Sequence, residues 1–174
     1  MGSEEPSHAA GRTGVDDLEN MRPITLDDSS RTALFAAQTE CTFVFATPQG
    51  WPAGVIVSYL VDGGSVWFTA ASSRLHVRAL ADEPRVSLVV SNTGTDLPGR
   101  QMVTIRGRAT VHRDRATRDW FFPRFVERMQ PNDPDAFARL LDSPDRVVVE
   151  VEVVRIPVSH DSTRLPGDGR GGNA

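Results

Sequence analysis

Two apolar segments joined by a pair of glycines constrain the fold of this chain more than any other feature. Residues 54–61 and 65–70 are mainly apolar, and Asp62, Gly63 and Gly64 separate them. Glycine adopts the positive φ angles that tight turns require, so the pattern predicts a β-hairpin. The first strand is apolar on both faces. We expect the core to cover one face and a partner subunit or a planar cofactor to cover the other.

The end of the second strand is a favourable place for a phosphate. Thr69 leads through residues 70–73 to Arg74, and a helical pattern over residues 73–81 then stops before Pro84. Unpaired N–H groups at a helix start, the positive end of its dipole, serine hydroxyls and a guanidinium all attract anions. Serine before a helix is also the ordinary N-cap, so the local sequence leaves both interpretations open.

Four further segments have the composition of β-strands, rich in β-branched and aromatic residues. They are residues 41–47, 85–91, 100–113 and 146–156. With the hairpin they make about six strands, and the short turns between consecutive strands favour antiparallel pairing. Gly107, in the middle of its strand, predicts a bulge or a sharp bend. The expected fold is mainly β (β+α), a six-stranded barrel with peripheral helices.

Helices are expected over residues 27–38, from Asp114 onward and over residues 135–141. Pro123 falls inside the second of these and is expected to kink or split it. Both chain ends are polar and lack periodicity. We therefore expect a disordered arm over residues 1–22, one barrel domain over 23–159 and a mobile tail over 160–174.

Composition excludes several classes of function. The net charge is −4 without a basic block, which disfavours nucleic acid, and no apolar run approaches the roughly 20 residues of a membrane helix. The start of the chain has no apolar segment typical of a secretory signal, and the single cysteine, Cys41, fits a reducing cytoplasm. We expect this thiol to be buried and inert.

All 19 basic residues are arginine, so Schiff-base chemistry on lysine is excluded. Anion recognition must use arginine, histidine, hydroxyls or backbone. The four histidines show no metal-binding spacing, so we expect no metal site; they are His8, His76, His112 and His160.

Five pieces of the sequence, in this order and spacing, resemble the pyridoxamine 5'-phosphate oxidase-like family of flavin-binding split barrels. They are residues 54–59, residues 66–69, the set Ser73, Arg74, His76 and Leu80, residues 82–88, and residues 105–111. The resemblance covers roughly residues 25–156. It implies a six-stranded split β-barrel and a homodimer with a cofactor in each inter-subunit groove. That cofactor is FMN in most members, a deazaflavin in a sister branch, and haem or its breakdown products in a few.

The resemblance also implies which residues bind the cofactor. The ring would lie along one strand, the phosphate would meet the next strand and the residues after it, and two residues of a later strand would reach the partner's flavin. The corresponding positions are Val55, Ile56, Val57 and Ser58 for the ring, Thr69, Ser73, Arg74 and His76 for the phosphate, Phe68 and Ser72 for further contacts with the cofactor, and Gln101 and Met102 for the partner's flavin. Arg106 is a weaker candidate at the groove edge. No catalytic residue is identified.

The chain departs from the family pattern at two places. His76 stands where many relatives have a phosphate-binding lysine or arginine, and its spacing puts it on the same helix face as Val77 and Leu80. A plain helix residue is the alternative interpretation. The C-terminal residues 159–164 lack the tryptophan with which true pyridoxamine phosphate oxidases grip their substrate. The resemblance therefore implies the fold and the cofactor class but not that substrate.

Two main hypotheses of function follow. The first is an FMN-dependent oxidoreductase with an unknown small-molecule substrate, in which Tyr59, Trp67 or Trp120 shape the substrate space. The second is a non-catalytic dimer that carries or senses a flavin, a deazaflavin or haem. A barrel without any cofactor is a third, weaker alternative.

Overall fold

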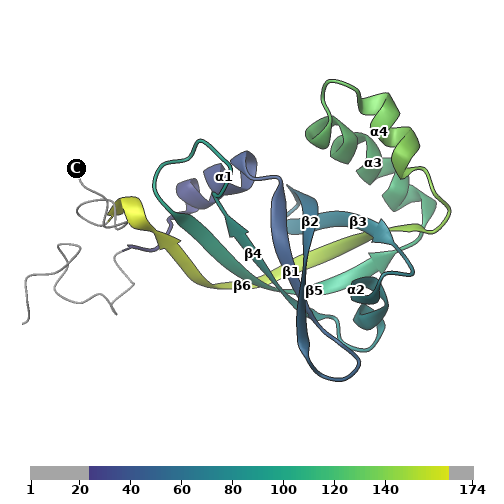
Figure 1. Ribbon diagram of the computed structural model, residues 1–174, viewed down its shortest axis with the longest axis horizontal. Coiled ribbons are helices and arrows are strands. Elements are labelled where there is room, and N and C mark those ends of the chain that lie inside the picture. Colours follow the sequence, from purple (N-terminus) through teal and green to yellow (C-terminus); the bar gives the residue numbers. More distant parts are fainter. Residues whose placement is uncertain (1–23, 165–174) are drawn as a thin grey trace, which may run out of the picture.

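Six antiparallel strands close into a barrel in the computed structural model, which describes residues 24–164 (Figure 1). The expected arm over residues 1–22 and the last ten residues of the expected tail lie outside the described residues. Around the barrel the strands follow the order β1-β2-β3-β6-β5-β4, and this confirms the expected mainly β barrel. The strands are β1 (Glu40–Ala46), β2 (Pro52–Asp62), β3 (Ser65–Ala71), β4 (Arg85–Ser91), β5 (Gln101–His112) and β6 (Arg146–Asp161).

The peripheral helices begin where aspartates cap them. The carboxylates of Asp27, Asp114 and Asp133 each accept a hydrogen bond from a backbone N–H in the first turn of α1, α3 and α4. Pro123 does not split α3, which is continuous. The helical elements are α1 (Asp28–Ala37), α2 (Leu75–Arg78), η2 (Ala79–Ala81), α3 (Arg115–Met129), α4 (Pro134–Leu141) and η3 (Ser162–Arg164).

Strand β2 is apolar on both faces because it separates two clusters of buried side chains. Tyr59 points into the barrel with Phe43 and Phe68, and all three are fully buried. Leu60, its neighbour, belongs to a second cluster beneath α3 that includes Phe121. Figure 1 shows α3 and α4 together at one end of the barrel. A partner subunit or a cofactor was expected to cover the second face of β2, and the chain's own helices α3 and α4 cover part of that face.

Gly107 allows β5 to bend, as its position in the strand predicts. The β5–β6 register shifts on both sides of Arg106. A Cβ atom on Gly107 would lie 2.4 Å from the Cγ1 atom of Val151 and 2.8 Å from the carbonyl oxygen of Glu152. Only glycine permits this close approach of the two strands.

Two expected boundaries are wrong. The helix expected over residues 73–81 is a four-residue α-helix followed by a 3-10 turn, and its N-cap is Arg74, not Ser72 or Ser73. Residues 160–164, expected in the tail, belong to ordered elements instead, because β6 continues to Asp161 and η3 to Arg164. The Ser162 hydroxyl accepts a hydrogen bond of 2.7 Å from the N–H of Arg100, which ties this end to the barrel. Within residues 24–164 no helix is both long and apolar enough to span a membrane.

Candidate functional site

Strands β2 and β3 separate from each other at one end of their hairpin, and this separation creates the site. Their pairing runs from the turn only as far as Tyr59 opposite Phe68. Beyond that point β2 remains paired with β1, whereas β3 remains paired with β6 through Ala71. The barrel is therefore split along residues 55–58, where no residue of β3 is paired opposite β2.

The free edge of β2 presents backbone groups to this split. The N–H of Tyr59 donates a 2.9 Å hydrogen bond to the carbonyl oxygen of Thr39, on the β1 side. Because N–H groups alternate along a strand, those of Ile56 and Ser58 point to the opposite side, toward β3. The edge thus offers hydrogen-bond donors and acceptors to a planar ligand.

A pocket of about 580 Å³ occupies the split. This volume is typical of a site for a small molecule or a cofactor. The pocket brings together seven of the twelve residues predicted from the resemblance, namely Val55, Ile56, Val57, Ser58, Thr69, Arg74 and His76. Its remaining lining residues are Ala70, Ala71, Leu75, Phe125, Phe137, Leu141 and Arg146.

The other five predicted residues do not line the pocket. The Phe68 side chain is fully buried in the barrel core, and Ser72 and Ser73 stand outside the lining. Gln101 and Met102 pair with the far end of β6, whose first residue is Arg146. At about 3.3 Å per residue that end is about 50 Å along the strand. Within one chain the two residues are remote from the pocket.

The hydroxyl group of Thr69 is already engaged. Its Oγ1 donates a 2.8 Å hydrogen bond to the carbonyl oxygen of Val147 on β6. A hydroxyl has one proton to donate, so in this arrangement Thr69 does not offer it to a phosphate. The bond instead fixes β3 against β6 at the edge of the pocket.

His76 turns its ring toward the aromatic core. Its centroid lies 6.2 Å from that of Phe43, 6.0 Å from that of Phe45 and 6.5 Å from that of Phe68. Burial, and then the nearby charge of Arg74, lower the pKa of His76 below its ordinary value of 6.5. The imidazole is therefore neutral at pH 7, so it does not supply the positive charge that the resemblance to the family implies at this position.

A second arginine at the pocket, Arg146, was not predicted from the sequence. It is the first residue of β6 and lies opposite Ala71 in the β3–β6 ladder. Its Nε atom is buried, and no hydrogen-bond partner for it exists in the described part of the chain. Burial, and then the charge of Arg74, lower the pKa of this guanidinium. The only signal in the sequence was an arginine at a strand start, and the pairing that brings it to β3 is not local.

The electrostatics of the pocket fit an anion. Arg74 and Arg146 both line it, and its lining contains no aspartate or glutamate. Neither guanidinium has a hydrogen bond or ion pair to another side chain among residues 24–164. A buried donor without a partner is costly, and an anionic ligand would satisfy it. The residues present therefore fit a phosphorylated planar cofactor, whose phosphate the arginines would hold. The four-residue α2 adds little dipole.

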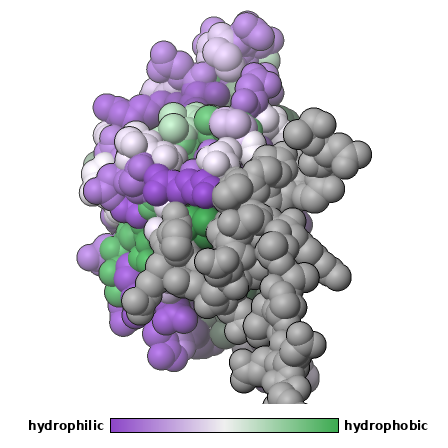
Figure 2. All heavy atoms as spheres, turned by 90° about the vertical axis from the view of Figure 1, so that its left-hand side faces the viewer, coloured by the Kyte–Doolittle hydropathy of each residue, from purple (hydrophilic) through white to green (hydrophobic). Residues whose placement is uncertain are grey.

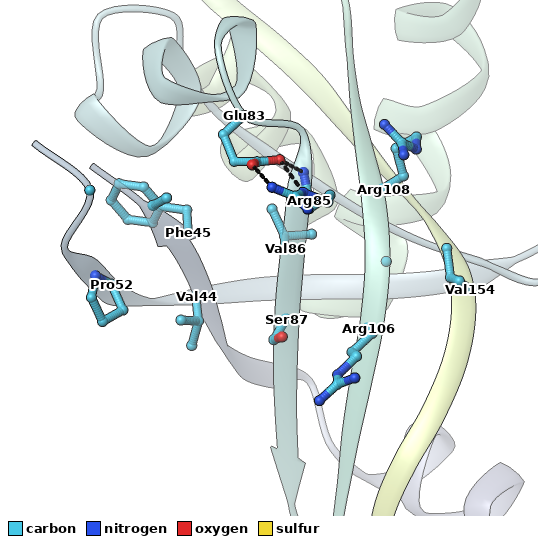
Figure 3. A pocket seen from close by; sticks show the side chains of 13 residues that line it. Val44, Phe45, Pro52, Glu83, Arg85, Val86, Ser87, Arg106, Arg108 and Val154 are labelled. Carbon is cyan, nitrogen blue, oxygen red and sulfur yellow. Dashed lines mark hydrogen bonds and ion pairs between the residues drawn. The ribbon is translucent and has the colours of Figure 1, made fainter. Parts of the chain in front are cut away.

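A second hollow of about 540 Å³ lies outside β1, β4 and β5 (Figure 3). It shares no lining residue with the pocket in the split. The carboxylate of Glu83 accepts hydrogen bonds from the guanidinium of Arg85 there, at 2.8 Å for Nε. Arg106, considered at the groove edge, lies at this hollow, so in one chain it is separate from the split.

The aromatic residues considered for a substrate space do not line the split. Tyr59 is fully buried in the barrel. Trp67 and Trp120 pack edge to face with ring centroids 4.7 Å apart, beside His112. Burial raises the pKa of the Cys41 thiol to about 12, so this buried cysteine is not a nucleophile. Among residues 24–164 no cluster of side chains suits a metal ion.

Comparison with solved structures finds the same fold in several proteins of low sequence identity. A conserved hypothetical protein from Mycobacterium tuberculosis, Rv2991, is 18% identical with a TM-score of 0.71, over 82% of this chain and 89% of that one. The heme storage protein HutZ from Vibrio cholerae is 14% identical with a TM-score of 0.62, over 76% and 94%. A FAD-binding protein from Mesorhizobium loti is 18% identical with a TM-score of 0.59, over 78% and 94%.

No curated protein matches the sequence. Residues 32–159, however, match the family described as pyridoxamine 5'-phosphate oxidase. This match spans most of the chain and includes every residue that lines the split between β2 and β3. The chain therefore belongs to the pyridoxamine 5'-phosphate oxidase family.

Proposed function

We propose that this protein is an FMN-dependent oxidoreductase that acts on a small molecule of unknown identity. The observation that carries the proposal is the pocket in the split, where the free edge of β2 faces two arginines without acidic partners. The family supports a flavin, and one structural neighbour is named as FAD-binding. The single buried cysteine also suits a reducing cytoplasm.

The chain's own residues would bind and orient the cofactor. The backbone N–H groups of Ile56 and Ser58 would donate to the ring edge that gains negative charge on reduction. Arg74 would hold the phosphate. The flavin would supply the redox chemistry, since its ring accepts and donates a hydride. Phe125 of α3 and Phe137 of α4, which line the pocket, would exclude water from one side.

We also propose that the functional unit is a homodimer with the cofactor in the groove between subunits. Ile56 is 62% exposed on β2, and Val154 and Val158 are 65% and 51% exposed on β6. Apolar side chains on the outer faces of strands favour contact with a second subunit. Hydrophobic residues also gather on one part of the side that Figure 2 shows, within a mostly hydrophilic surface. A partner would bring its Gln101 and Met102 toward the flavin.

The test is the absorption and fluorescence spectrum of the purified protein before and after FMN is added. We expect flavin bands that persist through gel filtration and that are lost in a Ser73→Ala/Arg74→Ala double variant. Arg78→Ala is the control, because Arg78 is exposed on the same short helix and does not line the pocket. A protein that stays colourless with excess FMN would contradict the proposal.

A non-catalytic carrier of flavin, deazaflavin or haem is the second candidate. The observation in its favour is that the pocket has no carboxylate, and that its one histidine packs on phenylalanines, so no proton donor stands out. Rapid oxidation of the protein's chemically reduced flavin by small quinones or nitro compounds would support the oxidoreductase. A bound flavin that is inert toward all of them would support the carrier.

A further inference from the structure

We infer that Arg74 and Arg146 form a two-arginine clamp that selects a flavin ending in a phosphate monoester, and that His76 adds no positive charge to it. This inference rests on the proposed function, because it names the form of cofactor that the same pocket takes. It adds a residue from β6, which lies far from the helix start in sequence, to the phosphate site.

The clamp follows from how β3 is held. Ala71, the last residue of β3, pairs with Arg146, and the Ser72 N–H then donates a 2.8 Å hydrogen bond to the carbonyl oxygen of Asp145. These contacts fix the chain on both sides of the turn that leads to Arg74. The Arg74 N–H donates to the Ala71 carbonyl at 3.0 Å, which closes the turn. These hydrogen bonds hold the backbone of both arginines at the pocket, which both residues line.

The Arg146 side chain lacks an acceptor that its surroundings require. Its Nε–H is buried and has no partner in residues 24–164. A guanidinium donates through Nε and one terminal nitrogen together, in a fork that matches two oxygens of one phosphate. Asp145, the preceding residue, is exposed and forms no ion pair with it. A phosphate in the split would satisfy the buried donor.

The charge balance distinguishes one phosphate from another. Two guanidiniums without a nearby carboxylate repel each other, and a ligand with two negative charges relieves this repulsion most fully. A phosphate monoester carries nearly two charges at pH 7 and has three free oxygens. A phosphodiester group carries one charge and has two free oxygens, so it would leave one guanidinium poorly paired. FMN ends in a monoester with its charge on one phosphorus, whereas FAD carries a diphosphate in which each phosphorus has one ester bond and one anhydride bond. Its two charges are therefore spread over two phosphates, each with two free oxygens.

His76 adds no positive charge to the clamp. Its Nε2, like the Nε of Arg146, is buried without a partner among residues 24–164, but the lowered pKa leaves the imidazole neutral at pH 7. Its ring packs against Phe43, Phe45 and Phe68 of the barrel core. Burial, and then the positive charge of Arg74, lower the pKa of His76 and so disfavour protonation of its imidazole. At the position where the resemblance implies a phosphate-binding cation, this chain thus has a neutral side chain packed against the barrel core. The Arg146 guanidinium supplies a positive charge in its place.

The test compares the affinities of FMN, FAD and riboflavin by fluorescence titration at pH 7. Loss of a charged hydrogen-bonded contact corresponds to a decrease of about 10- to 100-fold in affinity. We expect that loss for FMN in Arg146→Gln and in Arg74→Gln, with riboflavin binding unchanged. His76→Gln should retain wild-type affinity. Arg155→Gln is the matched control, because Arg155 is exposed on the same strand and does not line the pocket.

Arg146→Lys keeps a positive charge but not the fork, so its affinity for FMN should be intermediate. It provides a folded comparison if Arg146→Gln is unstable. The wild-type preference for FMN over FAD should shrink at least tenfold in both variants, whereas a preference due to the size of FAD would persist. Unchanged FMN affinity in both variants would overturn the clamp and leave the proposed function standing. A wild-type protein that binds neither FMN nor riboflavin would overturn both.

Discussion

The guanidinium of Arg128 donates a 2.9 Å hydrogen bond to the main-chain carbonyl oxygen of Phe35. It also donates to the carbonyl oxygens of Gln38 at 2.9 Å and of Tyr59 at 3.3 Å. One side chain of α3 thus satisfies carbonyl groups at the end of α1 and on β2. Because α3 also carries Phe125 of the pocket wall, this arginine holds the wall against the strand that would face the flavin.

Arg128→Gln is therefore expected to lower the free energy of unfolding by about 2–3 kcal/mol, since it removes several charge-assisted hydrogen bonds. Chemical denaturation measures this change. Arg115→Gln is the control, because the Arg115 side chain is 92% exposed and pairs only with Asp119, so its loss should cost less than about 0.5 kcal/mol. Equal stability of the two variants would show that the Arg128 network contributes nothing.

Gly107→Ala should be among the most harmful small substitutions in the barrel. The added Cβ would meet the side chain of Val151 at 2.4 Å and the backbone of Glu152 at 2.8 Å, and the backbone cannot move aside cheaply. We expect a loss of about 2–3 kcal/mol or more in the free energy of unfolding. Thr110→Ala, at an exposed position on the same strand, should change it by less than about 0.5 kcal/mol. A fully stable Gly107→Ala protein would contradict the close approach of β5 and β6.

Acid should destabilise the protein partly through two histidines, His76, which is half-buried, and His160, which is buried. The pKa values of His76 and His160 are both lowered from 6.5, first by burial and then by a nearby arginine. The unfolded chain therefore binds protons near pH 6.5 while the folded chain does not. This contribution to stability is present above pH 6.5 and is lost as the pH falls toward the folded-state pKa values.

The measurement is the free energy of unfolding from pH 7.5 down to pH 5.5 for the wild type and for His76→Gln. We expect a shallower loss in the variant, because the glutamine does not titrate. His112→Gln tests specificity, since the His112 Nε2 lies 3.0 Å from a carboxylate oxygen of Glu150, and loss of that hydrogen bond should lower stability instead. Parallel curves for the wild type and His76→Gln would contradict a neutral His76 with a lowered pKa.

A charge on the outer face of β2 should separate the proposed dimer. Ile56 is 62% exposed, and we expect Ile56→Glu to give a monomer by size-exclusion chromatography with light scattering and to weaken FMN binding. Leu140→Glu is the matched control, because Leu140 is 73% exposed on α4 and is not part of the proposed interface. A dimer that survives Ile56→Glu would require an interface elsewhere.

The fold could be predicted well because its signals are local. Apolar runs and segments rich in β-branched and aromatic residues located all six strands, Gly63 and Gly64 located the hairpin turn, and Gly107 located the bulge. Aspartates at residues 27–28 and 114 located the starts of two helices, and the break at residues 131–134 located the third. The end of the barrel domain was less predictable, since a polar run such as residues 159–162 resembles a tail in sequence and is buried by contacts with distant segments.

The site could be predicted only along its continuous segments. Residues 55–58 form one continuous segment, and Arg74 follows shortly after the next strand. The resemblance to the family predicted both. Arg146 could not be predicted, because its place depends on which strand pairs with β3. His76 was assigned to the phosphate by position, although its spacing with Val77 and Leu80 already indicated a buried helix face.

The most direct test of the central claim is native mass spectrometry of the protein after it is mixed with FMN and desalted. The claim is that the split between β2 and β3 holds the flavin between two subunits. We predict a species of twice the 19.0 kDa chain mass that retains one FMN per chain, and a flavin-free species when riboflavin replaces FMN. A single chain that retains FMN, or a dimer that retains none, would contradict the account.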